Sequence, residues 1–229
     1  MSIAQTNSSV LLQAERGSGK ELFARSIHAN SPRANKELIV INSTTIPAGI
    51  AESALFGHRK GAFTGAATDK KGVFEVANGS TIFIDEIGNM SLEVQNLLLR
   101  IAEYGDYRKV GDENGGGFLD IRIVAATNRD LVSLVKLGKF LPDLLDRLQF
   151  TANIPPLRER SDMELLAMHL LQTRYHGRMM SEHCKSRLHT YNWPGNVREL
   201  DGALKNAIID SPDGVIEWEN IAPYLRYKA

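Results

Sequence analysis

The chain has 229 residues and 27 basic and 27 acidic side chains, so its formal net charge is zero. A neutral chain has no overall positive field that would draw it to nucleic acid or to an anionic membrane. Because 43% of its residues are hydrophobic, it can bury the core of one large domain, or of a core domain with a smaller appendage.

The single cysteine, Cys184, excludes a disulfide within the chain and is typical of proteins from a reducing compartment. We expect its thiol to be structural, and the six histidines show no spacing typical of metal ligands. The N-terminal segment is polar, and no stretch approaches the ~18 apolar residues that a membrane span requires. The sequence therefore predicts a cytoplasmic protein without a membrane segment.

Four short apolar runs in the first two thirds of the chain predict buried strands, at residues 10–12, 38–41, 81–84 and 121–126. They alternate with segments of helical periodicity at residues 20–28, 91–103 and 130–137. Strands that alternate with helices form a parallel sheet covered on both faces. The sequence thus predicts an α/β fold, with a parallel sheet flanked by helices.

Pro155 and Pro156 end this alternation, because two prolines can continue neither a strand ladder nor a helix interior. Beyond them the sequence predicts only helices, each beginning at capping residues. These helices run from Ser161 and Asp162 toward Tyr175, from Ser181 and Glu182 onward, and from Asn196 to Ile209. We therefore expect an α/β core domain at residues 1–154 and a small helical lid subdomain at residues 155–229.

A glycine-rich loop follows the first predicted strand and opens a helix. Its sequence is close to the phosphate-loop pattern G-x-x-x-x-G-K-[ST] and reads Ala14, Glu15, Arg16, Gly17, Ser18, Gly19, Lys20, Glu21. Gly17 and Gly19 would let backbone N–H groups turn toward phosphate oxygens, and Lys20 would add positive charge for the β- and γ-phosphates. The loop predicts a nucleotide site; the alternative is an ordinary strand-to-helix turn.

Two positions of this loop differ from the strict pattern. Ala14 stands where the first glycine belongs, and Glu21 stands where a magnesium-binding hydroxyl is usual. If Ala14 must adopt a positive φ, the strain would cost about 1–2 kcal/mol and could distort the loop.

The predicted strand at residues 81–84 ends in two adjacent carboxylates, as the Walker B element of P-loop ATPases does. Asp85 could hold Mg²⁺, and Glu86 could polarise the attacking water. Asn128 follows the last predicted strand and would lie at the same edge of the sheet, where it could orient water or sense the γ-phosphate. It could equally form a turn that caps the next helix.

The most specific segment lies between these two elements and consists of Gly61, Ala62, Phe63, Thr64, Gly65 and Ala66, preceded by residues 52–58. Its glycines would hinge a loop that exposes an aromatic ring and a hydroxyl, which a loop seldom does without a partner. The segment resembles the signature of the sigma-54-dependent transcription activators, or bacterial enhancer-binding proteins. That resemblance implies a P-loop AAA+ fold whose loop contacts sigma-54 through Phe63 and Thr64, and moves with ATP hydrolysis to open the promoter complex.

The resemblance covers nearly the whole chain, including residues 72–77, 126–131, 155–160 and 193–200. It implies that Asn42 relays the state of the γ-phosphate to Glu86, and that Arg198 is the sensor II arginine, which reaches the nucleotide from the lid. From spacing alone, Arg198 could also be a surface arginine at the start of a helix. The resemblance further implies sigma-54 RNA polymerase as partner and self-association into a ring, a hexamer, or assembly with a paralogue.

This chain departs from the family pattern at the arginines that act across the subunit boundary. Leu141 replaces the first of the two, so Arg147 is the one arginine finger left. Because an arginine finger can contribute about 10³–10⁵ in rate, we expect slow hydrolysis. The chain is also short before Val10 and after Asn220, so we expect an open adenine pocket, no DNA-reading helix-turn-helix and an isolated central domain.

The sequence supports two functions from different classes. The first is an ATPase that remodels sigma-54 RNA polymerase and binds ATP and Mg²⁺ with the residues from Glu15 to Glu21 and with Arg198. Its catalysis would rest on Asp85, Glu86, Asn42, Asn128 and Arg147. The second is a hydrolysis-impaired nucleotide-binding module that acts through sigma-54 or a paralogous ring. A DNA-binding regulator is a weaker third interpretation, because the chain is neutral.

Overall fold

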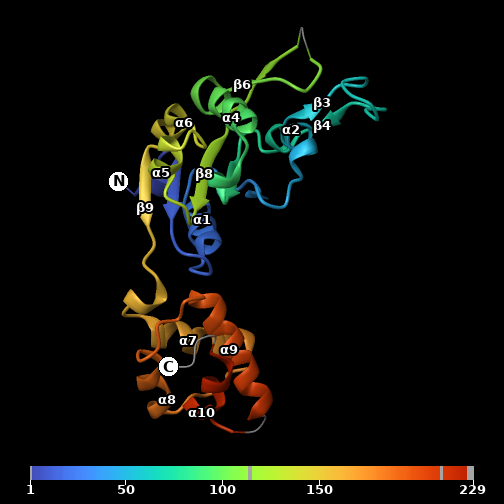
Figure 1. The fold of residues 1–229 in the computed structure, drawn as a ribbon. Helices are drawn as coiled ribbons and strands as arrows, with labels where there is room; N and C mark the ends of the chain where they lie inside the picture. Colours follow the sequence, from blue (N-terminus) through green and yellow to red (C-terminus); the bar gives the residue numbers. More distant parts are fainter. Residues whose placement is uncertain (1, 113–114, 212–213, 226–229) are drawn as a thin grey trace. The chain divides into compact units, whose positions relative to one another are not determined.

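A computed structural model describes residues 2–112, 115–211 and 214–225 of the chain (Figure 1). The chain folds into two compact units. The core unit comprises residues 1–13 and 20–153, and the lid unit comprises residues 14–19 and 154–229. The glycine-rich loop therefore groups with the helices of the lid, although it lies far from them in the sequence.

Five parallel strands form the sheet of the core unit, in the order β2-β5-β8-β1-β9. They are β1 (Val10–Gln13), β2 (Ile39–Asn42), β5 (Thr81–Asp85), β8 (Arg122–Thr127) and β9 (Phe150–Asn153). The predicted α/β fold with a parallel sheet is confirmed, and the four apolar runs are the first four of these strands. The sequence analysis missed β9, because this edge strand exposes all of its residues and has no apolar run.

Helices follow the strands of the core unit, and three of them, α1, α4 and α5, are the helices that the periodicity predicts, whereas α2, α3 and α6 were not predicted. They are α1 (Lys20–Ala29), α2 (Ala48–Phe56), α3 (Val73–Val76), α4 (Leu92–Tyr104), α5 (Leu131–Lys136) and α6 (Pro142–Arg147), with short 3₁₀ turns η1 (Ile3–Gln5) and η2 (Ile87–Asn89). The Ser91 hydroxyl caps α4, and the Asp130 carboxylate caps α5 by accepting from the Val132 N–H at 3.0 Å. Their apolar faces pack on the sheet around Phe74 and Leu98, both fully buried.

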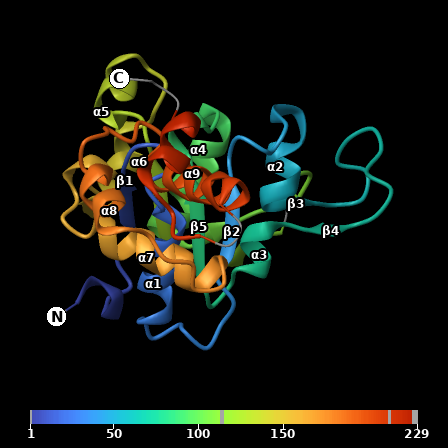
Figure 2. The same ribbon diagram turned by 90° about the horizontal axis from the view of Figure 1, so that it is seen from below.

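Two small hairpins complete the core unit: β3 (Gly57–His58) with β4 (Lys70–Lys71), and β6 (Asp106–Tyr107) with β7 (Gly117–Phe118). The loop between β3 and β4 contains the G-A-F-T-G-A segment. It projects away from the sheet of the core unit (Figures 1 and 2). None of the helices in the described part of the chain has both the length and the hydrophobicity that a transmembrane helix needs.

The lid unit has a separate hydrophobic core, built around the fully buried Trp193 and Leu200. Its elements are η3 (Leu157–Glu159), α7 (Met163–Arg174), α8 (Glu182–Leu188), α9 (Asn196–Asp210), α10 (Trp218–Ile221) and η4 (Ala222–Tyr224). Cys184 lies in this core, and burial raises the pKa of its thiol to about 12. A thiol with this pKa stays protonated near neutral pH, so its environment is that of the structural residue we expected.

The three predicted lid helices, α7, α8 and α9, begin where they were expected, but two of the predicted caps are wrong, and α10 was not predicted. Ser181 caps α8, because its hydroxyl accepts the Cys184 N–H at 3.1 Å. Asp162 instead accepts two hydrogen bonds from Arg160, at 2.8 and 2.6 Å. The cap position of α9 is Gly195, and the Asn196 amide forms hydrogen bonds with other segments instead of capping the helix. In both cases a competing hydrogen bond takes the side chain away from the helix end.

Arg122 is almost completely buried, and its guanidinium holds the N-terminal segment against the sheet. It donates hydrogen bonds to the carbonyl oxygens of Ser8 at 3.3 Å, Ala4 at 2.8 Å and Ile3 at 2.8 Å. Burial lowers the pKa of this guanidinium, because removing the charged form from water is unfavourable. The three carbonyl dipoles offset part of that penalty, so Arg122 fixes residues that precede β1.

Replacing Arg122 with Met should remove three charge-assisted hydrogen bonds while keeping most of the apolar volume. Such bonds contribute about 1.5–3 kcal/mol each. The variant no longer buries a charge, so the desolvation penalty disappears and offsets part of this loss. We expect the free energy of unfolding, measured by urea denaturation, to fall by roughly 3 kcal/mol. The exposed Arg25→Met is the control, with an expected change below about 0.5 kcal/mol. Equal losses in both variants would contradict the role given to Arg122.

Candidate functional site

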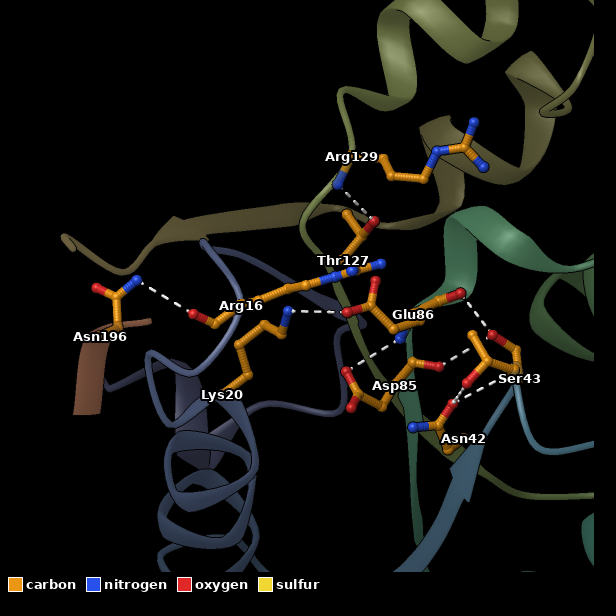
Figure 3. A network of polar contacts seen from close by, with 10 residues as sticks. Arg16, Lys20, Asn42, Ser43, Asp85, Glu86, Thr127, Arg129 and Asn196 are labelled. Atoms are coloured by element: carbon orange, nitrogen blue, oxygen red, sulfur yellow. Dashed lines mark hydrogen bonds and ion pairs between the residues drawn. The ribbon is translucent and has the colours of Figure 1, made fainter. Parts of the chain in front are cut away.

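Polar side chains gather at the carboxyl edge of the parallel sheet in the core unit (Figure 3). The strand register pairs Asn42 with Asp85 and Gln13 with Thr127. Because all five strands run in the same direction, each apolar strand ends in a polar residue at this one edge. This is the edge at which open α/β sheets bind their ligands.

Lys20 and Glu86 form a nearly buried ion pair at this edge. The Lys20 ammonium lies 3.3 Å from Glu86 Oε1, and the side chains are only 7% and 12% exposed. The Glu86 N–H donates to Asp85 Oδ1 at 3.0 Å. Burial raises the pKa of the Asp85 carboxyl above its usual range, and the Lys20 ammonium opposes this shift. The predicted Lys20, Asp85 and Glu86 are therefore together, and burial makes the ionised Asp85 dependent on nearby positive charge.

Glu86 has a left-handed backbone, with φ 56° and ψ 45°, which costs a residue with a Cβ about 1–2 kcal/mol. Ser43 holds this turn from the end of β2. Its hydroxyl lies 2.5 Å from the Glu86 carbonyl oxygen and 3.1 Å from that of Asp85, and its N–H donates to the Asp85 carbonyl at 3.1 Å. The sequence analysis missed Ser43, although its place directly after Asn42 at a strand end was a signal that could have found it.

Of the two predicted sensor asparagines, Asn42 is the last residue of β2 and Asn128 follows β8. The Asn42 amide oxygen accepts from the Thr44 N–H at 2.9 Å and from the Thr44 hydroxyl at 2.6 Å, which fixes the amide within its own loop. Asn128 does not cap α5, because Asp130 does so. The next residue, Arg129, donates to the Gly88 carbonyl at 2.9 Å, and so ties the segment after β8 to the turn after Glu86.

The glycine-rich loop belongs to the lid unit, where Gly17 and Gly19 adopt φ of 77° and 92°. Among the described residues, the non-glycine residues with positive φ do not include Ala14, so the strain considered for Ala14 is not present. Ser18 is only 3% exposed, and its hydroxyl has no hydrogen-bond partner among the described residues. A buried hydroxyl without a partner is costly, so Ser18 favours a ligand that would satisfy it.

The last residue of the predicted phosphate pattern, Glu21, points along the surface of α1. Its carboxylate accepts two hydrogen bonds from Arg25, at 2.9 and 2.7 Å, and both side chains are half-exposed. In the lid unit the Arg198 N–H donates to the Gly17 carbonyl at 3.2 Å, so the backbone of Arg198 contacts the loop. Its side chain is exposed in the first turn of α9. The predicted Arg16 is joined to the same helix start through its carbonyl, which accepts from Asn196 at 3.1 Å.

Arg147 ends α6 and is paired within its own subunit. Its guanidinium lies 2.5 Å from Glu103 on α4, and its side chain is 45% exposed. Leu141, at the position where the resemblance implies an arginine, packs against the hydrophobic core of the core unit. Its N–H donates to Gln95 at 2.9 Å, so this position anchors the start of α6.

The β3–β4 loop exposes Phe63 and Thr64 of the predicted contact segment, whereas Ala66 is buried. Phe63 is 44% exposed and packs edge-to-face on His58, with ring centroids 5.0 Å apart, and Thr64 is exposed. The Gly61 N–H donates to the Ala66 carbonyl at 2.9 Å, which closes the tip. Arg59 binds Asp69 at 2.9 Å and Asp112 at 3.1 Å, so this loop is held to the segment after β6.

Comparisons with known proteins agree with this geometry. Residues 1–153 match the family model described as the Sigma-54 interaction domain, and residues 158–229 match the AAA+ ATPase lid domain. The anaerobic nitric oxide reductase transcription regulator NorR of Citrobacter koseri is 45% identical over 90% of this chain. The nitrogen fixation protein AnfA of Azotobacter vinelandii is 45% identical over 98% of it. The chain spans 42% and 43% of the length of these two relatives.

Solved structures give the same result. NtrX from Brucella abortus in complex with ATP has a TM-score of 0.83 and 30% identity, over 96% of this chain and 52% of NtrX. The ADP complex of S. cerevisiae Hsp104 has a TM-score of 0.61 and 16% identity, over 91% of this chain and 41% of Hsp104, and shows the fold alone. The matched family model covers well over half of the sequence. This chain therefore belongs to the sigma-54 interaction domain family and consists of an AAA+ domain of that family with its lid.

Proposed function

We propose that this chain binds ATP with Mg²⁺ and hydrolyses it, and that its β3–β4 loop uses the resulting motion to remodel sigma-54 RNA polymerase. The observation that carries this proposal is the convergence of Lys20, Asp85 and Glu86 at the carboxyl edge of the sheet. Its support from the comparisons is the family membership and a similar structure whose complex contains ATP. We place the boundary between the nucleotide-binding core domain and the lid subdomain between residues 154 and 155.

The side chains present fit the proposed ligands. The unsatisfied Ser18 hydroxyl and the positive-φ glycines suit phosphate oxygens, which accept hydrogen bonds from such loops. Among the described residues there is no cluster of three or more side chains that could hold a metal. Mg²⁺ in nucleotide sites needs only one or two carboxylates together with phosphate oxygens and water, and Asp85 supplies one. When bound, Mg²⁺ would neutralise charge that develops on the phosphate oxygens.

Each residue then has a separate part in hydrolysis. Lys20 would attract the β- and γ-phosphates, which frees Glu86 from its ion pair to orient and polarise the attacking water. Asn42 and Asn128 would sense the γ-phosphate from the ends of β2 and β8, and Arg198 would do so from the lid. Arg147 would leave Glu103 to stabilise charge on the nucleotide of a neighbouring subunit in a ring, a hexamer by resemblance.

The alternative function, a hydrolysis-impaired interaction module, is not favoured. The relatives found are transcription regulators, and Ala14 lacks the backbone strain that would have distorted the glycine-rich loop. Leu141 still removes one arginine, so we propose slow hydrolysis rather than none.

The test of a shared site uses two inactive variants. Glu86→Gln should lower the rate of phosphate release from ATP by about 10²–10⁴, because it removes the proposed base. Arg147→Ala should lower it by about 10³. A mixture should regain activity, because a mixed ring contains sites with both groups intact, and the wild-type rate should rise cooperatively with protein concentration. The control Arg174→Ala removes another ion-paired arginine and should stay active alone. A mixture as inactive as its components would contradict a site shared between subunits.

The partner is tested at the loop tip. Phe63→Ala should weaken binding of fluorescently labelled sigma-54 in the presence of ATP by roughly 5–30-fold, because exposed aromatic rings are common anchors at interfaces. ATP hydrolysis should continue, since Phe63 lies outside the nucleotide site. The control is Phe118→Ala, which removes a ring that is 73% exposed on the neighbouring β6–β7 hairpin. Equal sigma-54 binding by both variants and the wild type would exclude Phe63 as an anchor.

Ser43 provides a test of the Glu86 turn. Ser43→Ala removes a hydrogen bond of about 1 kcal/mol, which corresponds to roughly fivefold in rate if Glu86 is mispositioned. We expect steady-state kinetics to show a lower kcat with little change in KM. In the control Thr45→Ala, a hydroxyl from the same loop stops donating to the Asn42 carbonyl, and kcat should be retained. A reduced kcat in both variants would mean that the loop, and not the Ser43 hydroxyl, is what matters.

A further inference from the structure

The glycine-rich loop is fastened to the lid by a carboxylate, Glu15. Arg158 of η3 binds it with two parallel hydrogen bonds, from Nη1 to Oε2 at 3.0 Å and from Nη2 to Oε1 at 2.7 Å. The Asn196 amide donates to Oε2 at 3.0 Å. The hydrogen bond from Arg158 and, next, that from Asn196 lower the pKa of the Glu15 carboxyl, so it is ionised at neutral pH. A paired arginine fork has a defined geometry, which fixes direction as well as distance.

Asn196 joins three segments of the lid unit through one buried amide. Its nitrogen donates to Glu15 and to the Arg16 carbonyl, at 3.0 and 3.1 Å, and its oxygen accepts the Leu157 N–H at 2.7 Å. The residue is fully buried and has a left-handed backbone with φ 53°. Both amide hydrogens and the oxygen are therefore used, and an unusual backbone conformation aims them at the loop and at η3.

The backbones of the loop and of the α9 start approach each other closely. A Cβ added to Gly17 would lie 2.2 Å from the Gly195 carbonyl oxygen, and φ of Gly17 is 77°. The Gly17 carbonyl in turn accepts the Arg198 N–H at 3.2 Å. Gly17 is thus required by the contact with the lid as well as by the shape of a phosphate loop.

We propose that Glu15, Arg158 and Asn196 form a clamp, here called the loop–lid clamp, that makes residues 14–19 move with the lid as one body. The proposal rests on the nucleotide binding proposed above. A loop that surrounds phosphates changes with the nucleotide, and a rigid connection passes that change to η3 and α9. Glu15 belongs to the loop predicted above to bind nucleotide, but its carboxylate accepts hydrogen bonds from Arg158 and Asn196. All three clamp residues therefore act through the position of the loop, as positioning residues. By thermodynamic reciprocity, the lid position must then affect nucleotide affinity as much as the nucleotide affects the lid.

The experiment reverses the Arg158–Glu15 pair, whose side chains are 37% and 42% exposed and can be changed without opening the core. The variants are Glu15→Arg, Arg158→Glu and the double reversal. Binding of fluorescent ADP is measured together with amide hydrogen exchange of η3 and α9, with and without ADP. A milder variant, Arg158→Lys, keeps the charge but removes the fork, and it serves if a reversal does not fold. The control is Arg160→Ala, which breaks an ion pair with Asp162 in the same connection but not one with the loop.

In the wild type, ADP should slow exchange in η3 and α9. Each single reversal should lose most of this protection and bind ADP at least about fivefold more weakly, and the double reversal should restore both. Arg158→Lys should lose part of the protection, while Arg160→Ala should keep it. Wild-type affinity and ADP-induced protection in the single reversals, even with a lower melting temperature, would overturn the clamp and leave a purely structural ion pair. A wild-type chain that does not bind ADP would overturn the proposed function and the clamp together. The two failures are therefore distinguished by whether the wild type binds ADP.

Discussion

The left-handed turn at Glu86 is the constraint on which the site of the core unit depends. A chain leaving β5 in the usual extended conformation would carry the second carboxylate away from the sheet edge. The turn instead brings it to the Lys20 ammonium, at about 1–2 kcal/mol of backbone strain. Ser43 offsets part of that strain with its hydroxyl and its N–H, both directed at carbonyls of the turn. The end of β2 therefore determines where the carboxylate that follows β5 lies.

Among the described residues of the lid unit, His176, Trp193 and Asn196 also have a positive φ, and Asn196 is the one that bonds to the glycine-rich loop. Strained non-glycine backbone persists only where neighbouring contacts over-determine it, and such residues cluster at sites that bind or switch. Glu86 is held by the hydroxyl of Ser43, and Asn196 by three hydrogen bonds of its own amide. In each case the strained residue joins segments distant in sequence. In each unit a strained residue thus directs a polar side chain at a distant segment: Glu86 at Lys20 of α1, and Asn196 at the glycine-rich loop.

The sequence could predict the parts of this fold that follow from local patterns. Apolar runs predicted β1, β5 and β8 because strands buried on both faces are continuously hydrophobic. They also predicted β2, an edge strand that is only partly buried but begins with three apolar residues. β9 has no such signal, since every residue of this edge strand is exposed. The predicted Asn196 cap was wrong because the competing acceptors, Glu15 and the Arg16 carbonyl, are far away in the sequence. The motif located Asp85 and Glu86, but no local pattern shows that the glycine-rich loop makes its contacts with the lid.

The geometry of α6 also supports Arg147 as the proposed arginine finger of a shared site. The Arg147–Glu103 pair is partly exposed, and exposed pairs contribute about 0–1 kcal/mol. Exchanging Glu103 for the phosphates of a neighbouring subunit would therefore cost little, whereas a buried pair would hold the guanidinium in place. Leu141 cannot share this task, because its side chain is apolar; it packs against the core, and its N–H anchors the start of α6 to Gln95. The packing that fixes α6 thus leaves Arg147, at the other end of the same helix, as the side chain able to change partners.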